Sequence, residues 1–225
     1  MTRALIAAKS GWGKSWFCQQ WTEENLPKYD IAVLLDYKDE YRGLAKAGKA
    51  QWCGIGRPEG QLSPADWQGL LDDNPRLVCA RSVGLADWRV FCATIIQAVR
   101  SLGETALVVV DEAHFAAPQG TGYPDEIKGL ATTGRGEGVS SAWVTQRLQE
   151  LDETIISQAD TRLLGGFNSG RDMTKIRPVT PYNADVHDIT ESHPGGKWEE
   201  PVGKHDAEDG IAGSEWIYST DGGSV

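Results

Sequence analysis

A short apolar run that leads into a glycine-bearing turn constrains the fold of this chain more than any other feature. Residues 5–8 are apolar, and the turn after them contains Gly11 and Gly13 and ends in Lys14 and Ser15. Glycine permits positive φ and close approach of the backbone to a ligand, and backbone N–H groups at a helix N-terminus attract anions. A strand, such a turn and a helix, in this order, predict a phosphate-binding loop. The residues expected to hold phosphate are Ala8, Lys9, Ser10, Gly11, Trp12, Gly13, Lys14 and Ser15.

The last two residues of this loop carry the expected chemistry. Lys14 is predicted to reach the β- and γ-phosphates of ATP, and the Ser15 hydroxyl to help hold Mg²⁺. The pattern G-x-x-x-x-G-K-[ST] has glycine where this chain has Ala8, which is the smallest possible departure. The alternative is a glycine-rich turn that binds nothing. The strand before the turn favours the phosphate loop.

The length and composition fit one domain with a tail. The chain has 225 residues, and no apolar run approaches the ~20 residues needed to span a bilayer. No signal segment opens the chain, and with only a few residues before the first strand we expect neither an N-terminal domain nor a membrane anchor. The four cysteines form no C-x-x-C pair, which indicates buried thiols in a reducing cytosol rather than disulfides or a zinc site.

The acidic charge is concentrated at the C-terminal end. The segment from residue 183 to the end contains ten acidic residues and only two basic ones, Lys197 and Lys204. It therefore carries −8 of the net charge of −10. The rest of the chain is nearly neutral. This balance neither supports nor excludes contact with DNA, which could depend on a few basic loop residues.

Strand and helix patterns alternate along the first 170 residues, which predicts a parallel α/β sheet between two layers of helices. After about residue 177 prolines, glycines and acids predominate, which indicates an irregular acidic tail. We therefore expect an ATPase domain at 1–177 and the tail at 178–225. Strands are expected at 2–8, 31–35, 77–80, 106–110, 140–145 and 161–167. Helices are expected at 14–24, from Ser63, and at 88–102, 125–133 and 148–158.

An apolar strand at residues 106–110 ends in a pair of acids. Asp111 would enter the coordination sphere of the metal, and Glu112 would polarise a water for in-line attack on the γ-phosphate. An acidic pair at a strand end is also common as a helix cap, but its place about 100 residues after a phosphate loop favours catalysis. Gln146 ends the next strand and is expected beside both acids, at the edge where ligands of α/β folds bind. Its role would be to sense the γ-phosphate or to orient the attacking water.

Arg135 lies eleven residues before Gln146, between Gly134 and Gly136. A planar, permanently charged group on a flexible turn suits an arginine finger that acts on the site of a neighbouring subunit. The alternative is a solvated surface arginine. Arg147 is a competitor, but it directly follows Gln146 and should point to the opposite face or begin the next helix.

Together these motifs resemble the HerA/FtsK class of P-loop DNA-pumping ATPases, and especially the small genome-packaging ATPases of archaeal and bacterial viruses with an internal membrane. In that class an arginine, a glycine three residues later and a Thr-Gln-Arg end form the trans-acting finger and the sensor, at the spacing found here. The likeness covers roughly residues 2–170, although the short glycine-rich loop at 118–122 gives no clear pore motif. The stretches that carry it are Lys9–Ser15, Val108–Glu112 and Arg135–Arg147.

The resemblance implies a RecA-like, three-layer α/β fold that works as a ring, usually a hexamer, with ATP at subunit interfaces and double-stranded DNA in the pore. It also implies a place in the host cytoplasm or at the packaging vertex of a virion, with portal or membrane proteins of the capsid as partners. The sequence supports a ring independently, because a single domain with a trans arginine completes its site only beside a neighbour. We therefore predict an ATP-driven DNA translocase, specifically a viral packaging motor, with a HerA-like cellular or conjugative translocase as the alternative.

The sequence also bears on other classes of P-loop protein. Residues 111–114 spell the motif of a helicase group that needs two RecA-like domains, and this chain has room for one. A regulatory GTPase is excluded because no Asn-Lys-x-Asp motif occurs. A small-molecule kinase stays open, although Arg76, Arg81 and Arg89 are scattered and form no compact lid. A nucleotide-gated assembly factor that never touches DNA also stays open.

Four further residues near the motifs are candidates of lower rank. Trp12 and Trp16 flank the loop at helical spacing. Either ring could stack on a base, but packing against neighbouring helices is the expected role. Asp36 and Lys38 follow the second strand at the ligand edge and could assist.

Overall fold

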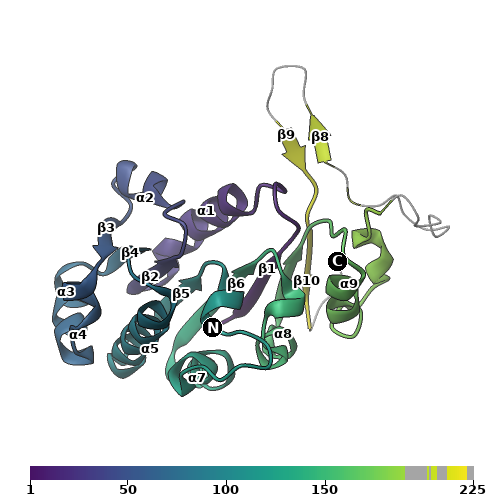
Figure 1. The fold of residues 1–225 in the computed structure, drawn as a ribbon. Coiled ribbons are helices and arrows are strands. Elements are labelled where there is room, and N and C mark those ends of the chain that lie inside the picture. Colours follow the sequence, from purple (N-terminus) through teal and green to yellow (C-terminus); the bar gives the residue numbers. More distant parts are fainter. Residues whose placement is uncertain (191–201, 203, 207–211, 222–225) are drawn as a thin grey trace.

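The computed structural model describes residues 1–190, 202, 204–206 and 212–221, and an eight-stranded sheet forms its centre (Figure 1). The strands are β1 (Arg3–Ala7), β2 (Ile31–Asp36), β3 (Gln51–Ile55), β4 (Arg76–Arg81), β5 (Ala106–Val110), β6 (Val139–Thr145), β7 (Thr161–Leu164) and β10 (Ile217–Thr220). Their order across the sheet is β10-β7-β1-β6-β5-β2-β4-β3. Every neighbouring pair in this sheet is parallel except β10 and β7.

Helices cover both faces of the sheet. They are α1 (Lys14–Asn25), α2 (Arg42–Lys46), α3 (Arg57–Gly60), α4 (Pro64–Asp73), α5 (Leu85–Ser101), α6 (Ala113–Ala116), α7 (Asp125–Thr132), α8 (Glu153–Gln158) and α9 (Gly170–Ile176). Short 3₁₀ turns are η1 (Leu26–Lys28), η2 (Gly134–Glu137), η3 (Leu148–Glu150) and η4 (Ala184–His187). Figure 1 shows α1 and α2 on one side of the sheet and α4, α5, α7 and α8 on the other.

The strands are buried on both faces because of this arrangement. Within β1, Leu5 packs in the core shared with α5, whereas Ile6 packs in the core shared with α1. β2 and β5 are buried at every position, as their continuous apolar runs indicate. The three-layer α/β fold with a mainly parallel sheet is confirmed.

Local capping explains where several helices begin. Ser63 starts α4 because its hydroxyl accepts the N–H of Asp66 and the Asp66 carboxylate accepts the N–H of Ser63, a capping box. The prediction of a single helix at 148–158 is wrong. The chain forms η3 and then α8, because the Asp152 carboxylate accepts the N–H of Thr154 at 2.7 Å and starts a new helix.

Several strands differ from the sequence prediction. The strand expected at 161–167 ends at Leu164, where Gly165 and Gly166 pack against the Trp12 ring. Edge strand β3 was not expected, since it is only partly buried and lacks a continuous apolar run. No helix in the described part of the chain is long and apolar enough to cross a membrane.

The C-terminal stretch is more ordered than an irregular tail where it is described. β8 (Lys204–Asp206) and β9 (Ala212–Ser214) pair antiparallel in a two-stranded sheet, and β10 joins the main sheet beside β7. β10 was missed because four residues supply too little pattern and their partners in β7 lie more than fifty residues away. Many of the tail's acids, Glu199 and Glu200 among them, lie outside the described residues. The division of the chain at residue 177 stays a prediction.

Candidate active site

The predicted phosphate loop connects β1 to α1 at the carboxyl edge of the sheet. Gly11 and Gly13 have φ of 74° and 81°, a region that side chains with a Cβ disfavour. Gly13 is the N-cap of α1, so helical N–H groups begin at Lys14. Positive φ among non-glycine residues of the described chain occurs only at Asp39 and Glu112. Ala8 therefore does not have positive φ, and its backbone conformation does not require glycine.

The loop faces a cavity of about 250 Å³ to which other strand ends contribute. β6 separates β1 from β5 in the sheet, so Gln146 emerges between the loop and the acidic pair. Most predicted site residues line this cavity, but four of them do not: Ala8, Lys9, Trp12 and Arg135. The lining residues are Ser10, Gly11, Gly13, Lys14, Ser15, Trp16, Lys38, Glu40, Asp111, Glu112 and Gln146.

Glu112 is the centre of the polar contacts in the cavity. Its Oε1 accepts a hydrogen bond from Gln146 Nε2 at 2.9 Å and forms an ion pair with Lys38 Nζ. Its Oε2 lies 3.4 Å from Nδ1 of the buried His114, which also contacts Thr145 Oγ1 at 3.0 Å. Glu112 has φ 44° and ψ 49°, a left-handed conformation that costs a non-glycine residue about 1–3 kcal/mol and is concentrated at functional sites. The backbone strain and the three partners fix this carboxylate at the cavity wall.

Burial and crowded charge shift the ionisation of the neighbouring groups. Burial raises the pKa of Asp111 well above its usual range, and the nearby carboxylates of Glu112 and Asp36 raise it further. Burial lowers the pKa of Lys14, although Glu112 and Asp111 act in the opposite direction. A bound cation would favour the ionised form of Asp111 and so offset the effect of its burial.

A divalent cation fits these residues. Asp111 Oδ2 is buried and, among the described residues, has no hydrogen-bond partner. The Ser15 hydroxyl lines the same cavity and donates to a Glu40 carboxylate oxygen. Carboxylate and hydroxyl oxygens are ligands that Mg²⁺ accepts, and it usually combines one or two of them with phosphate oxygens and water. Ser15 and Asp111 are the residues that would hold it.

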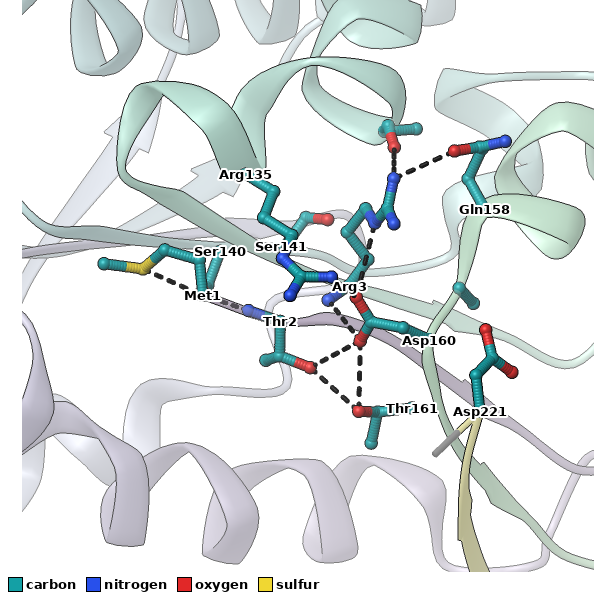
Figure 2. Close-up of polar contacts among 12 residues, drawn as sticks. Met1, Thr2, Arg3, Arg135, Ser140, Ser141, Gln158, Asp160, Thr161 and Asp221 are labelled. Carbon is teal, nitrogen blue, oxygen red and sulfur yellow. Dashed lines mark hydrogen bonds and ion pairs between the residues drawn. The ribbon is translucent and has the colours of Figure 1, made fainter. Parts of the chain in front are cut away.

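Arg135 lies at the opposite edge of the sheet from this cavity. It belongs to η2, which precedes β6, and its side chain is 55% exposed. Figure 2 shows its guanidinium beside Asp160, which precedes β7; Nη1 lies 3.3 Å from Asp160 Oδ2. The same carboxylate also accepts bonds from Thr2 Oγ1 and from the N–H and Nε of Arg3. Because parallel strands all begin at one edge and end at the other, Arg135 cannot reach the phosphate loop of the same chain.

Sequence reasoning missed part of the loop that covers the site. The Asp36 carboxylate accepts the N–H groups of Glu40 and Tyr41 at 3.0 and 2.9 Å, which folds residues 37–41 over the phosphate loop and brings Lys38 to Glu112. The available signal was an acid at a strand end followed by several polar residues. No sequence pattern indicated that Glu40 would line the site.

The two tryptophans beside the loop have different surroundings. Trp12 is buried, as expected, although against Gly165, Gly166 and the C-terminal stretch rather than against helices. Packing was the wrong prediction for Trp16, which is 70% exposed on the rim of the cavity.

The strand, the glycine turn that ends in Lys-Ser, and the acidic pair two strands away define a P-loop NTPase fold. Comparison with known proteins gives no matching family model and no matching curated protein. Solved structures do match. The genome packaging NTPase B204 from Sulfolobus turreted icosahedral virus 2, in complex with ATP-gammaS, has a TM-score of 0.58 and 16% identity, over 78% of this chain and 79% of that chain.

Two further solved structures are similar to this chain in fold. B204, the DNA-packaging ATPase from Sulfolobus Turreted Icosahedral Virus, has a TM-score of 0.58 and 15% identity, over 78% of this chain and 80% of that chain. VirB4 of Thermoanaerobacter pseudethanolicus has a TM-score of 0.62 and 12% identity, over 97% of this chain and 88% of that chain. Identities this low show a shared fold, so the resemblance to the HerA/FtsK class is confirmed as a likeness of fold.

Proposed function

We propose that this chain is a Mg²⁺-dependent ATPase that assembles into a ring, usually of six subunits, and moves double-stranded DNA. The observation that carries the proposal is the division of the predicted site between two edges of the sheet. Lys14, Ser15, Asp111, Glu112 and Gln146 meet in one cavity, whereas Arg135 is exposed at the other edge. A second subunit can supply the missing arginine, which is how head-to-tail contacts in rings complete a site.

Each residue has a role that its position supports. When bound, ATP supplies the γ-phosphoryl group, and Mg²⁺ neutralises its charge. The N–H groups between Gly11 and Ser15 and the Lys14 ammonium would bind the phosphates, while Ser15 and Asp111 would hold the cation. Glu112 takes the proton of the attacking water, and Gln146, hydrogen-bonded to Glu112, orients that water.

Glu112 can accept the proton of water only when its ion pair with Lys38 is weakened or broken. The paired ammonium lowers the pKa of a carboxylate and makes the carboxylate a weaker base. Lys38 is 39% exposed, so it can move to solvent or to a phosphate. Arg135 of a neighbouring subunit then stabilises the charge that develops on the phosphoryl group.

The DNA-moving role rests on the sequence resemblance and on similarity to B204, a packaging NTPase by its printed description. We infer a viral genome-packaging motor, located in the host cytoplasm or at the virion vertex, with portal or membrane proteins of the capsid as partners. Similarity to VirB4 keeps a conjugative or HerA-like translocase as the second candidate.

ATP hydrolysis measured with and without duplex DNA, across protein concentrations and near physiological salt, tests the proposal. We expect turnover that rises steeply with protein concentration, because the ring completes the site, and that rises further with duplex DNA. ATP turnover that duplex DNA does not change would contradict a DNA translocase and favour an assembly factor or a small-molecule kinase. No ATP binding at all would refute every candidate.

A further inference from the structure

The middle residue of the phosphate loop is turned away from the nucleotide cavity. Trp12, between the two positive-φ glycines, is 2% exposed. Its ring occupies space that is left by two glycines after β7. A Cβ at Gly165 would lie 2.3 Å from Trp12 Nε1, and a Cβ at Gly166 would lie 2.7 Å from Trp12 Cη2. The loop is therefore anchored through its own side chain on the far side from the ligand.

The C-terminal stretch completes this anchor from about 200 residues away in sequence. Trp12 Nε1 donates to the Glu215 carbonyl at 3.1 Å, and Ser214 Oγ donates to the Trp12 carbonyl at 2.8 Å. Trp216 Nε1 in turn donates to Ser214 Oγ at 3.1 Å. We call residues 214–216 the strap. Figure 1 shows the stretch from β9 to β10 running past the turn between β1 and α1.

The strap also contacts the helix that follows the loop. The Trp216 ring stacks on Phe17 of α1, with centroids 4.4 Å apart and planes at 12°. Trp216 and Ile217 also pack against a small apolar cluster formed by Ala8, Trp12 and Val202. β10 then fixes the strap to the sheet, because Ile217 pairs with Leu164 of β7. Both the loop and the first turn of α1 thus have a partner in the same three residues.

This arrangement matters because the loop carries two glycines and is intrinsically flexible. Ordering a backbone residue costs conformational entropy, and a loop that is ordered before the ligand arrives avoids that cost on binding. The strap bonds to the carbonyl and to the ring of Trp12, so it restrains the peptide units on which the phosphate-facing N–H groups are carried.

We propose that Ser214 and Trp216 are positioning residues of the phosphate site, which hold the loop in the conformation that accepts a nucleoside triphosphate. Docking of the strap and binding of the nucleotide are then coupled. Coupling is reciprocal, so nucleotide also stabilises the docked strap. The proposal rests on nucleotide binding at this loop, as the proposed function does, but not on DNA or on a ring.

Three variants of the full chain test the coupling in equilibrium binding of ATP-γ-S with Mg²⁺. Ser214→Ala removes the bond to the Trp12 carbonyl and should weaken binding about 5-fold. Trp216→Ala removes the stacking and the bond to Ser214, and should weaken it by about 5- to 150-fold, the usual range for coupled sites. Tyr218→Ala is the matched control, since Tyr218 lies on β10 and is 55% exposed. It should bind as the natural chain does.

Hydrogen exchange supplies a readout that a purely structural role would not change. In the natural chain, ATP-γ-S should slow exchange of the amides of residues 212–217, and in Ser214→Ala this protection should shrink. Variants that melt lower yet bind nucleotide with unchanged affinity overturn the proposal, as does unchanged exchange of the strap on binding. If the natural chain itself binds no nucleotide, the proposed function fails first.

Discussion

Replacing Gly165 by alanine gives a test of the loop anchor whose size can be worked from the structure. The new Cβ would lie 2.3 Å from Nε1 and 2.4 Å from Cδ1 of Trp12, and 2.8 Å from the Ala8 Cβ. Carbon contacts are normally about 3.5–4.0 Å, so Trp12 must move by about 1 Å. Gly165 does not have positive φ, so the backbone accepts alanine and the effect is steric.

Because Trp12 is buried and belongs to the phosphate loop, a shift of its ring must also shift the loop backbone. Overpacking of this kind costs about 1–3 kcal/mol of unfolding free energy. A 1 Å misplacement of a binding group can lower turnover about 100-fold. We therefore expect Gly165→Ala to melt lower and to hydrolyse ATP about two orders of magnitude more slowly.

Urea unfolding and steady-state ATP hydrolysis measure the two effects. Gly170→Ala is the control, because a Cβ there meets nothing within 4 Å and lies at the start of α9. It should leave hydrolysis unchanged. Adding Trp12→Phe to Gly165→Ala provides a smaller ring and should recover part of the activity. Gly165→Ala protein with natural turnover would refute the claim that the Trp12 anchor sets the loop.

Three other perturbations have expected outcomes. Glu112→Gln should bind ATP normally but lower single-turnover hydrolysis by about 10²- to 10⁴-fold, the usual contribution of a general base. Arg135→Ala should abolish turnover in the ring while leaving nucleotide affinity of the monomer unchanged, and mixing it with Glu112→Gln protein should restore some activity; no recovery at any ratio would contradict a trans finger. Burial lowers the pKa of His187 to about 4, below its unfolded value of about 6.5. Its contribution to stability is therefore complete above pH 6.5 and is lost as the pH falls toward 4, by about 3 kcal/mol. Urea unfolding of His187→Gln should show a correspondingly flatter pH dependence over that window.

Sequence patterns of short range predicted much of the fold. The runs at 31–35 and 106–110 and the box at Ser63 depend on neighbours within a few residues, and all three formed as expected. Predictions failed where long-range packing decides. The segment at 148–158 has helical composition, but the Asp152 cap divides it, and the four residues of β10 are a strand only because β7 lies beside them.

The candidate site shows the same division. The sequence by itself determined that the chain has a loop with the glycines to bind phosphate and an acidic pair at a strand end, because each motif is contiguous. The sequence also placed Gln146 beside the acids, since it ends the next strand, and the bond from Gln146 to Glu112 bears this out. Only the tertiary structure decided that Lys38 pairs with Glu112 and that Trp12 is held by Ser214. Those two contacts join residues 74 and 202 positions apart, so no local pattern encodes them.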